Sequence, residues 1–180
     1  MGTPKMLLPW GATTVLEKIL KLTKSVATDQ CYIISGENHN QLQKIAQLHS
    51  VHLIKNPNWQ RGMGNSLAHG IRAVMNQSSA VLVLLADMPT IELFQLNALI
   101  ETYTLSKADA VCTQYPKMRG VPAVFRHTLF DQLGSLDGDI GARQLFNLQG
   151  IAVATHCVPW DYEDIDTPEA YQKLKNKYRL

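Results

Sequence analysis

The apolar run from Ala80 to Ala86, followed by Asp87-Met-Pro89, most constrains the fold of this chain. Val and Leu dominate the run, as they do in strands that are buried on both faces of a parallel sheet. Open α/β sheets bind ligands at the carboxyl ends of their strands, so Asp87 is a candidate functional residue. The alternative is structural, because Asp is also a good N-cap for the helix expected next.

Strand-like and helix-like segments alternate along the chain, which predicts an α/β fold with a parallel sheet and right-handed crossovers. The section from 114 to 150 is richer in Gly and Pro and breaks the alternation, so we expect an antiparallel or inserted portion there. We expect one domain, 1–180. The pattern predicts strands at 31–35, 51–54, 80–86, 108–113, 121–125 and 151–158, and helices at 14–27, 40–48, 63–75, 91–105, 128–133, 141–148 and 167–177.

Composition narrows the classes of protein that need to be considered. The chain is 46% hydrophobic and 18% charged, with a net charge of +2, which favours neither nucleic acid nor a membrane surface as a partner. It has no apolar run of about 18 residues and no signal-peptide pattern. Cys31, Cys112 and Cys157 lie far apart in apolar contexts. We therefore expect three buried, reduced thiols in a cytoplasmic protein.

A second acidic cluster lies near the C-terminus. Thr167-Pro168-Glu169 is typical of a helix start, with Thr167 as the N-cap. That interpretation does not explain Asp164 and Asp166. In an extended segment, the side chains of these two residues would point to the same side. Two such carboxylates repel one another unless water or a cation separates them. Together with Asp87 they could share Mg²⁺, which binds to few protein oxygens when phosphates complete its coordination.

Two further segments carry weaker signals. Lys5 lies in a Gly- and Pro-rich stretch, 1–12, where a solvated loop lysine would be unremarkable. Gly62-Met-Gly64-Asn-Ser66 leads directly into a helix, and free N–H groups at a helix start suit an anion or a base edge. This segment matches neither the dinucleotide fingerprint nor the P-loop, so a tight turn with a helix cap is equally consistent with it.

Taken together, these segments resemble the molybdenum cofactor cytidylyltransferases, within the MobA-like nucleotidyltransferase superfamily. The resemblance spans nearly the whole chain, and its pieces occur in the same order and at matching spacing. They are Met1-Gly-Thr-Pro-Lys5 with Leu7-Leu-Pro9; Asn56-Pro57 with Trp59, Gly62-Met-Gly64 and Ser66-Leu67; Leu85-Ala-Asp-Met-Pro89; Gly120 with Pro122; Gly138-Asp139 with Gly141-Ala-Arg143; and Asp164-Ile-Asp-Thr-Pro-Glu169.

The resemblance implies a three-layer, mostly parallel sheet with Rossmann-like nucleotidyltransferase architecture. It also implies an Mg²⁺-dependent reaction in which the terminal phosphate of molybdopterin attacks the α-phosphate of CTP and pyrophosphate leaves. Lys5 would contact the triphosphate, Asp87 would be catalytic, and Asp87 and Asp166 would bind the metal. The expected partners are CTP, a molybdopterin-type cofactor, and a molybdoenzyme or its chaperone.

The resemblance also divides the binding surfaces. Gly62, Gly64 and Ser66 would line the base and ribose, so the part from about 1 to 105 would bind the nucleotide. The part from about 106 to 180 would bind the acceptor, through 119–122 and 138–143. Pro4-Lys5 is similar to the first motif of the cytidylyl branch, whereas the guanylyl branch tends to carry Asp-Lys there.

This chain departs from the family pattern in two ways. The family opens with a strand and a Leu-Ala-Ala-Gly loop before the Met-Gly, whereas this sequence starts at Met1-Gly2. We therefore expect strand edges without a neighbour, and weak or absent CTP binding by this chain. The family also usually has Gly-His-Pro where this chain has Gly120-Val121-Pro122, and valine can neither hydrogen-bond through its side chain nor carry a proton.

Three other functions compete with this interpretation. The chain could be a catalytically impaired relative that serves as a cofactor-binding module, or a transferase that uses another phosphorylated acceptor, such as a sugar phosphate. A flavodoxin-like receiver shares the Asp-Met-Pro after an apolar strand. Receivers, however, need an acidic pair after their first strand and lack the terminal Asp-x-Asp-Thr-Pro.

Overall fold

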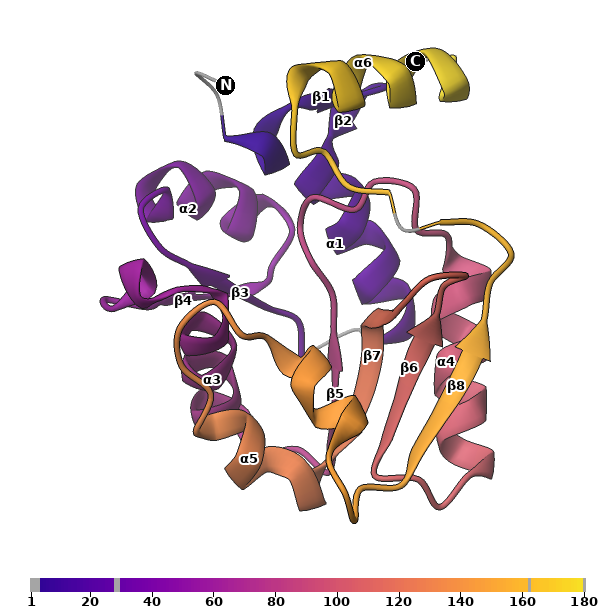
Figure 1. The fold of residues 1–180 in the computed structure, drawn as a ribbon. Helices are drawn as coiled ribbons and strands as arrows, with labels where there is room; N and C mark the ends of the chain where they lie inside the picture. The colour runs from indigo at the N-terminus through magenta and orange to yellow at the C-terminus, as the bar shows by residue number, and fades with distance from the viewer. Residues whose placement is uncertain (1–3, 28–29, 162, 180) are drawn as a thin grey trace.

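In the computed structural model, which describes residues 4–27, 30–161 and 163–179, helices cover both sides of a central layer of strands (Figure 1). The expected α/β alternation is present. The strands are β1 (Pro9–Trp10), β2 (Thr13–Thr14), β3 (Tyr32–Ser35), β4 (His52–Lys55), β5 (Ala80–Val83), β6 (Ala110–Gln114), β7 (Arg119–Arg126) and β8 (Val153–Cys157). The α-helices are α1 (Val15–Val26), α2 (His39–Leu48), α3 (Met63–Val74), α4 (Leu93–Leu105), α5 (Phe130–Gly134) and α6 (Pro168–Tyr178), with 3₁₀ turns η1 (Lys5–Leu7), η2 (Trp59–Arg61), η3 (His127–Leu129) and η4 (Ala142–Asn147).

The described strands of the central layer form two separate sheets, apart from the small β1–β2 hairpin. In one, β3 and β4 pair in parallel. In the other, the order is β5-β7-β6-β8, and β6 and β8 are parallel. β7 runs antiparallel to both its neighbours, which confirms the antiparallel portion expected between residues 114 and 150.

The larger sheet packs its two faces against different helices, which creates the three layers. On one face, Val111 and Val124 pack with Leu99 of α4. On the other face, Cys112 and Phe125 pack with the segment that contains α5 and η4. Neighbouring residues of β6 and β7 thus point to opposite faces, as the period of two in a strand requires.

Local signals fix the helix boundaries as expected. At α1, the Thr14 side chain accepts from the Glu17 amide, and the Glu17 side chain accepts from the Thr14 amide at 2.7 Å. This capping box satisfies N–H groups that would otherwise lack a partner. At α6, the side chain of Thr167 accepts from the Ala170 amide, and Pro168 is the first helical residue.

The strand that the sequence predicts over 80–86 differs in length and burial from the expectation. β5 ends at Val83, and all four of its residues are only half-buried, whereas burial on both faces was expected. Within the described chain, β5 pairs with β7 alone and β3 with β4 alone. Among the described strands, each of these two therefore has one edge without a neighbour, as expected.

The expectation of three buried thiols is wrong for one cysteine. Cys31 and Cys112 are buried and Cys157 is exposed, and all three are free thiols. Cys157 is the last residue of β8, which is an edge strand, so little chain covers it. No helix in the described part of the chain is long and apolar enough to cross a membrane.

Candidate active site

Three distant parts of the chain meet beyond the carboxyl end of β5. Lys5 of η1 forms an ion pair with Asp166, and the charges of Asp87, Asp164 and Asp166 all act on its ammonium group. The amide of Ile165 donates to the carbonyl oxygen of Asp87 at 3.2 Å. Ile165 is fully buried with Trp10, so it holds the two flanking aspartates beside Asp87.

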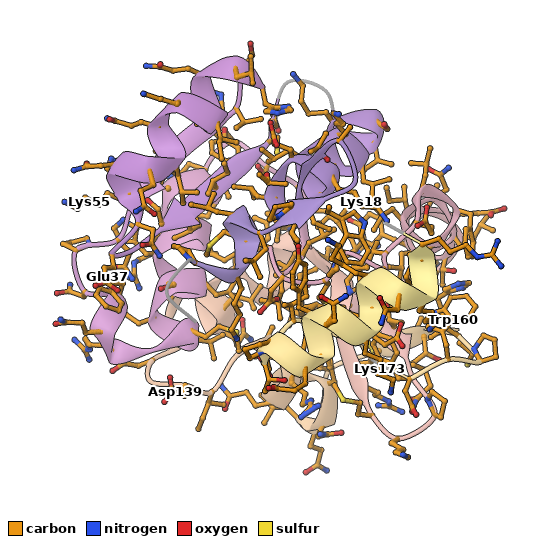
Figure 2. The ribbon with its side chains drawn as sticks, turned by 90° about the horizontal axis from the view of Figure 1, so that it is seen from above. Lys18, Glu37, Lys55, Asp139, Trp160 and Lys173 are labelled. Carbon is orange, nitrogen blue, oxygen red and sulfur yellow. The ribbon has the colours of Figure 1, made fainter. Side chains whose placement is uncertain are left out.

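The turn that carries Asp87 is anchored from both sides. Met88 and Ile91 are almost fully buried, which fixes the backbone after Asp87. Lys18 of α1 donates to the carbonyl oxygen of Pro89 at 2.5 Å and to Glu92 Oε1 at 2.8 Å. Figure 2 looks down on this end of the molecule and labels Lys18. Lys18 therefore stabilises the turn that carries Asp87, a role that could not be predicted from the sequence.

The site combines one lysine ammonium group with carboxyl groups whose pKa values are raised. Burial is the main cause that raises the pKa of Asp87 above its ordinary value. Burial also raises the pKa of Asp164, and the charges of Asp166 and Asp87 add to that effect. The hydrogen bond to Asp166 is the main cause that raises the pKa of Lys5, so Lys5 stays charged.

Asp87 Oδ1 is buried and has no hydrogen-bond partner among the described residues. A buried carboxylate oxygen without a partner costs free energy, and cation binding would offset that cost. The donors available here, carboxylate oxygens, are those that Mg²⁺ and Mn²⁺ prefer. Within the described residues no group of three or more His, Cys, Asp or Glu side chains could hold an ion, so substrate phosphates and water would complete its coordination.

A polar network holds the 56–66 loop. Asn56 is fully buried, and its Nδ2 donates to Asn65 Oδ1 at 3.0 Å and to Ser66 Oγ at 3.1 Å. Asn65 in turn donates to Asp137 Oδ1 at 3.1 Å, and Arg61 forms an ion pair with the same carboxylate. Asp137 is not among the residues that the sequence pattern singles out, although its place in the acidic Asp-Gly-Asp stretch is a usable signal.

The two glycines of this loop pack directly against the 137–140 segment. Gly62 has φ +108°, and a Cβ there would overlap the backbone of Gly138. The Gly64 amide donates to the Gly138 carbonyl oxygen at 2.8 Å, and a Cβ on Gly64 would overlap the carbonyl oxygen of Ile140. Close packing thus explains both glycines, and the contact of Gly62, Gly64 and Ser66 with a base and ribose remains a prediction.

The segments expected to face the acceptor come together near the start of β7. Arg143 Nε donates to the Arg119 carbonyl oxygen at 3.1 Å, and Arg119 donates through a terminal guanidinium nitrogen to the Phe146 carbonyl oxygen at 3.2 Å. Tyr115 donates to the Val121 carbonyl oxygen at 2.9 Å, so the residue that departs from Gly-His-Pro has a defined backbone position. Both arginines are exposed and form no ion pair with a described carboxylate.

The fold and this site define an α/β nucleotidyltransferase. Residues 1–155 match the model of the MobA-like NTP transferase domain, and the chain belongs to that family.

The chain is similar to relatives of several kinds. Purine catabolism protein PucB of Bacillus subtilis is 28% identical over 97% of this chain and 89% of its own length. Molybdenum cofactor cytidylyltransferase of Escherichia coli is 24% identical over 99% of this chain and 90% of its own. The structure of Rv0371c of Mycobacterium tuberculosis in complex with manganese has a TM-score of 0.81 and 24% identity, over 95% of this chain and 90% of that one.

Proposed function

We propose that this nucleotidyltransferase moves CMP from CTP to the terminal phosphate of a molybdopterin cofactor. The observation that carries the proposal is the meeting of Lys5, Asp87, Asp164 and Asp166 at one end of the sheet. One cation and several carboxylates suit a triphosphate together with a divalent metal. The cytidylyl and molybdopterin parts are supported by the Pro4-Lys5 motif and by the similarity to the Escherichia coli cytidylyltransferase.

In the reaction, an oxygen of the acceptor phosphate attacks the α-phosphorus of CTP. A new P–O bond forms as the bond from the α-phosphorus to the bridging oxygen breaks, and pyrophosphate carries the electron pair away. The protein contributes chiefly by positioning and by neutralising charge. Lys5 stays protonated because its pKa is raised. When CTP binds, the Lys5 ammonium group would leave Asp166 and contact phosphate oxygens instead.

Asp87 and Asp166 would hold Mg²⁺, which when bound would offset the charge that develops on the phosphate oxygens. The orphaned oxygen of Asp87 is the donor best prepared for this role, since it already lacks a partner. Asp164 lies beside both and adds negative charge that attracts a cation. Arg119 and Arg143 would face the anionic acceptor.

A coupled assay of pyrophosphate release tests this function. The protein is incubated with Mg²⁺, CTP and molybdopterin, and each component is omitted in turn. We expect release only when all three are present. Release with a sugar phosphate but not with molybdopterin would overturn the acceptor, and equal release with GTP would overturn the nucleotide. Binding of molybdopterin without any release would favour the cofactor-binding module instead.

A further inference from the structure

The position of the Asp87 carboxyl group depends largely on the backbone that carries it. Its Oδ1 is buried and has no hydrogen-bond partner among the described residues. β5 ends at Val83, and Leu84 to Asp87 pair with no described strand. Side chains that bind a metal are usually oriented by neighbouring hydrogen-bond partners. Because this oxygen lacks such a partner, the contacts that anchor the surrounding backbone determine where it lies.

Lys18 of α1 provides one of these anchors. Its ammonium group donates to the Pro89 carbonyl oxygen at 2.5 Å and to Glu92 Oε1 at 2.8 Å. The Lys18 side chain is only 21% exposed, so water competes little with these contacts. Hydrogen bonds from a charged donor are also stronger than those between neutral groups. Lys18 thus fixes a carbonyl group two residues after Asp87.

The apolar face of α1 packs against the same turn. Leu22 and Val26 follow Lys18 at intervals of four residues and pack in one cluster with Met88 and Ile91. Residues four positions apart lie on the same face of a helix. Lys18 is therefore the polar member of the row of α1 side chains that faces the turn.

The same helix also contacts the other segments of the candidate site. Leu16 packs in one cluster with Met6, the residue after Lys5. Val15 packs in one cluster with Ile165, which lies between the other two aspartates of the site. α1 therefore contacts every segment that contributes a charged group, and its lysine fixes the turn after β5 relative to the other segments.

We propose that Lys18 is a positioning residue for the nucleotidyl transfer, which acts through Pro89 and Glu92 to hold Asp87 where it can share a metal ion with Asp166. This role rests on the proposed function, in which Asp87 is a metal ligand. Metal sites require their ligands to be held within about 0.5 Å of the productive geometry. Without Lys18 the Pro89 carbonyl group loses its partner, and the turn can shift by more than that.

Binding of Mn²⁺ alone, followed by the electron paramagnetic resonance signal of the free ion, tests this role. The test variant is Lys18→Met. The matched control is Lys24→Met, because Lys24 is also a partly buried lysine of α1 and donates to a backbone carbonyl oxygen, that of His49 at the end of α2, at 2.6 Å. Asp87→Asn reports on the proposed metal site itself.

We expect Lys18→Met to weaken Mn²⁺ binding by about tenfold and Lys24→Met to change it by less than about twofold, because only the first lysine supports a metal ligand. Both variants should lower the Tm to a similar extent, since each removes one hydrogen bond to a carbonyl oxygen. Lys18→Arg keeps a charged donor and should recover most of the affinity.

Two results would overturn the positioning role. One is equal weakening by Lys18→Met and Lys24→Met, which would reflect a general loss of stability. The other is an unchanged affinity in Lys18→Met when Asp87→Asn has lost Mn²⁺ binding. If Asp87→Asn bound Mn²⁺ as well as the parent protein does, the proposed metal site would be wrong, and the role of Lys18 would be wrong with it.

Glu92→Gln provides a milder variant should Lys18→Met fail to fold. It removes the negative charge beside the Lys18 ammonium group but keeps an oxygen that can accept from the Gln95 amide at the start of α4. We expect this variant to weaken Mn²⁺ binding by about threefold, in line with the loss of a partly exposed ion pair. An unchanged affinity in Glu92→Gln would then overturn the proposal.

Discussion

At the scale of single residues, Asp87 is the point at which stability and function oppose each other. Its buried oxygen has no hydrogen-bond partner, and its pKa is raised chiefly by burial. A carboxyl group with a raised folded pKa stabilises the fold below its unfolded pKa and loses that contribution as the pH rises through the folded pKa. The metal-free protein therefore bears the cost of an ionised Asp87 at neutral pH.

Asp87→Asn should abolish turnover because it removes a proposed metal ligand, yet it should stabilise the metal-free protein at neutral pH. We expect a gain of about 1 kcal/mol, or roughly 3 °C in Tm, that disappears below the unfolded pKa of aspartate. Thermal melts across pH would measure this, with the exposed Asp131→Asn as the control. An active, unchanged Asp87→Asn variant would contradict the metal assignment.

Lys5→Gln should weaken CTP binding by about tenfold or more, because a charge-assisted contact with the triphosphate is lost. Titration calorimetry with CTP and Mg²⁺ would measure it. Lys21→Gln removes an exposed lysine of α1 and should leave the affinity unchanged. If both variants bound CTP equally well, Lys5 would be a surface lysine whose only partner is Asp166.

At the scale of elements, most helices could be predicted from the sequence, because their signals are local. The Thr14 and Thr167 caps mark two helix starts within a few residues. The end of β5 could not be predicted, because strand length depends on a neighbouring edge and no described strand pairs with Leu84 to Ala86. The hydrogen bond from Asn65 to Asp137 could not be predicted either, since it joins residues 72 positions apart.

Gly64→Ala tests the packing between the 56–66 loop and the 137–140 segment. The added methyl group would overlap the carbonyl oxygen of Ile140, so we expect a loss of about 1–3 kcal/mol in the free energy of unfolding. Urea denaturation would measure it. Gly134→Ala places a methyl group at ordinary contact distance, 3.5 Å from Arg72 Cγ, and should cost far less. Equal stability of the two variants would refute the close approach.

At the scale of the whole molecule, the candidate site draws Lys5, Asp87 and the pair Asp164 and Asp166 from the beginning, middle and end of the chain. The sequence suggested that Asp87 could share Mg²⁺ with Asp164 and Asp166, but their meeting could not be derived from it, because it depends on how residues 163–166 lie against the turn after β5. The hydrogen bond from the Ile165 amide to the Asp87 carbonyl oxygen holds the two segments together. Ligands that bridge these parts should therefore stabilise the whole fold.

Mn²⁺ with CTP should raise the Tm at neutral pH, by the equivalent of about 2.7 kcal/mol at a hundredfold excess over Kd. The shift should shrink on acidification, because the raised pKa values of Asp87 and Asp164 let protons compete with the metal at a higher pH than at ordinary aspartates. Melting curves with and without the ligands would show it. A shift that is independent of pH, or that persists in Asp87→Asn, would place the metal elsewhere.

The proposed transfer of CMP is tested most directly by pyrophosphate release from CTP and molybdopterin. Release would be followed for the 180-residue protein and for its Asp87→Asn variant. We expect Mg²⁺-dependent release that requires both substrates and is lost in the Asp87→Asn variant. No release from the folded 180-residue protein, or equal release from the Asp87→Asn variant, would contradict the proposed function.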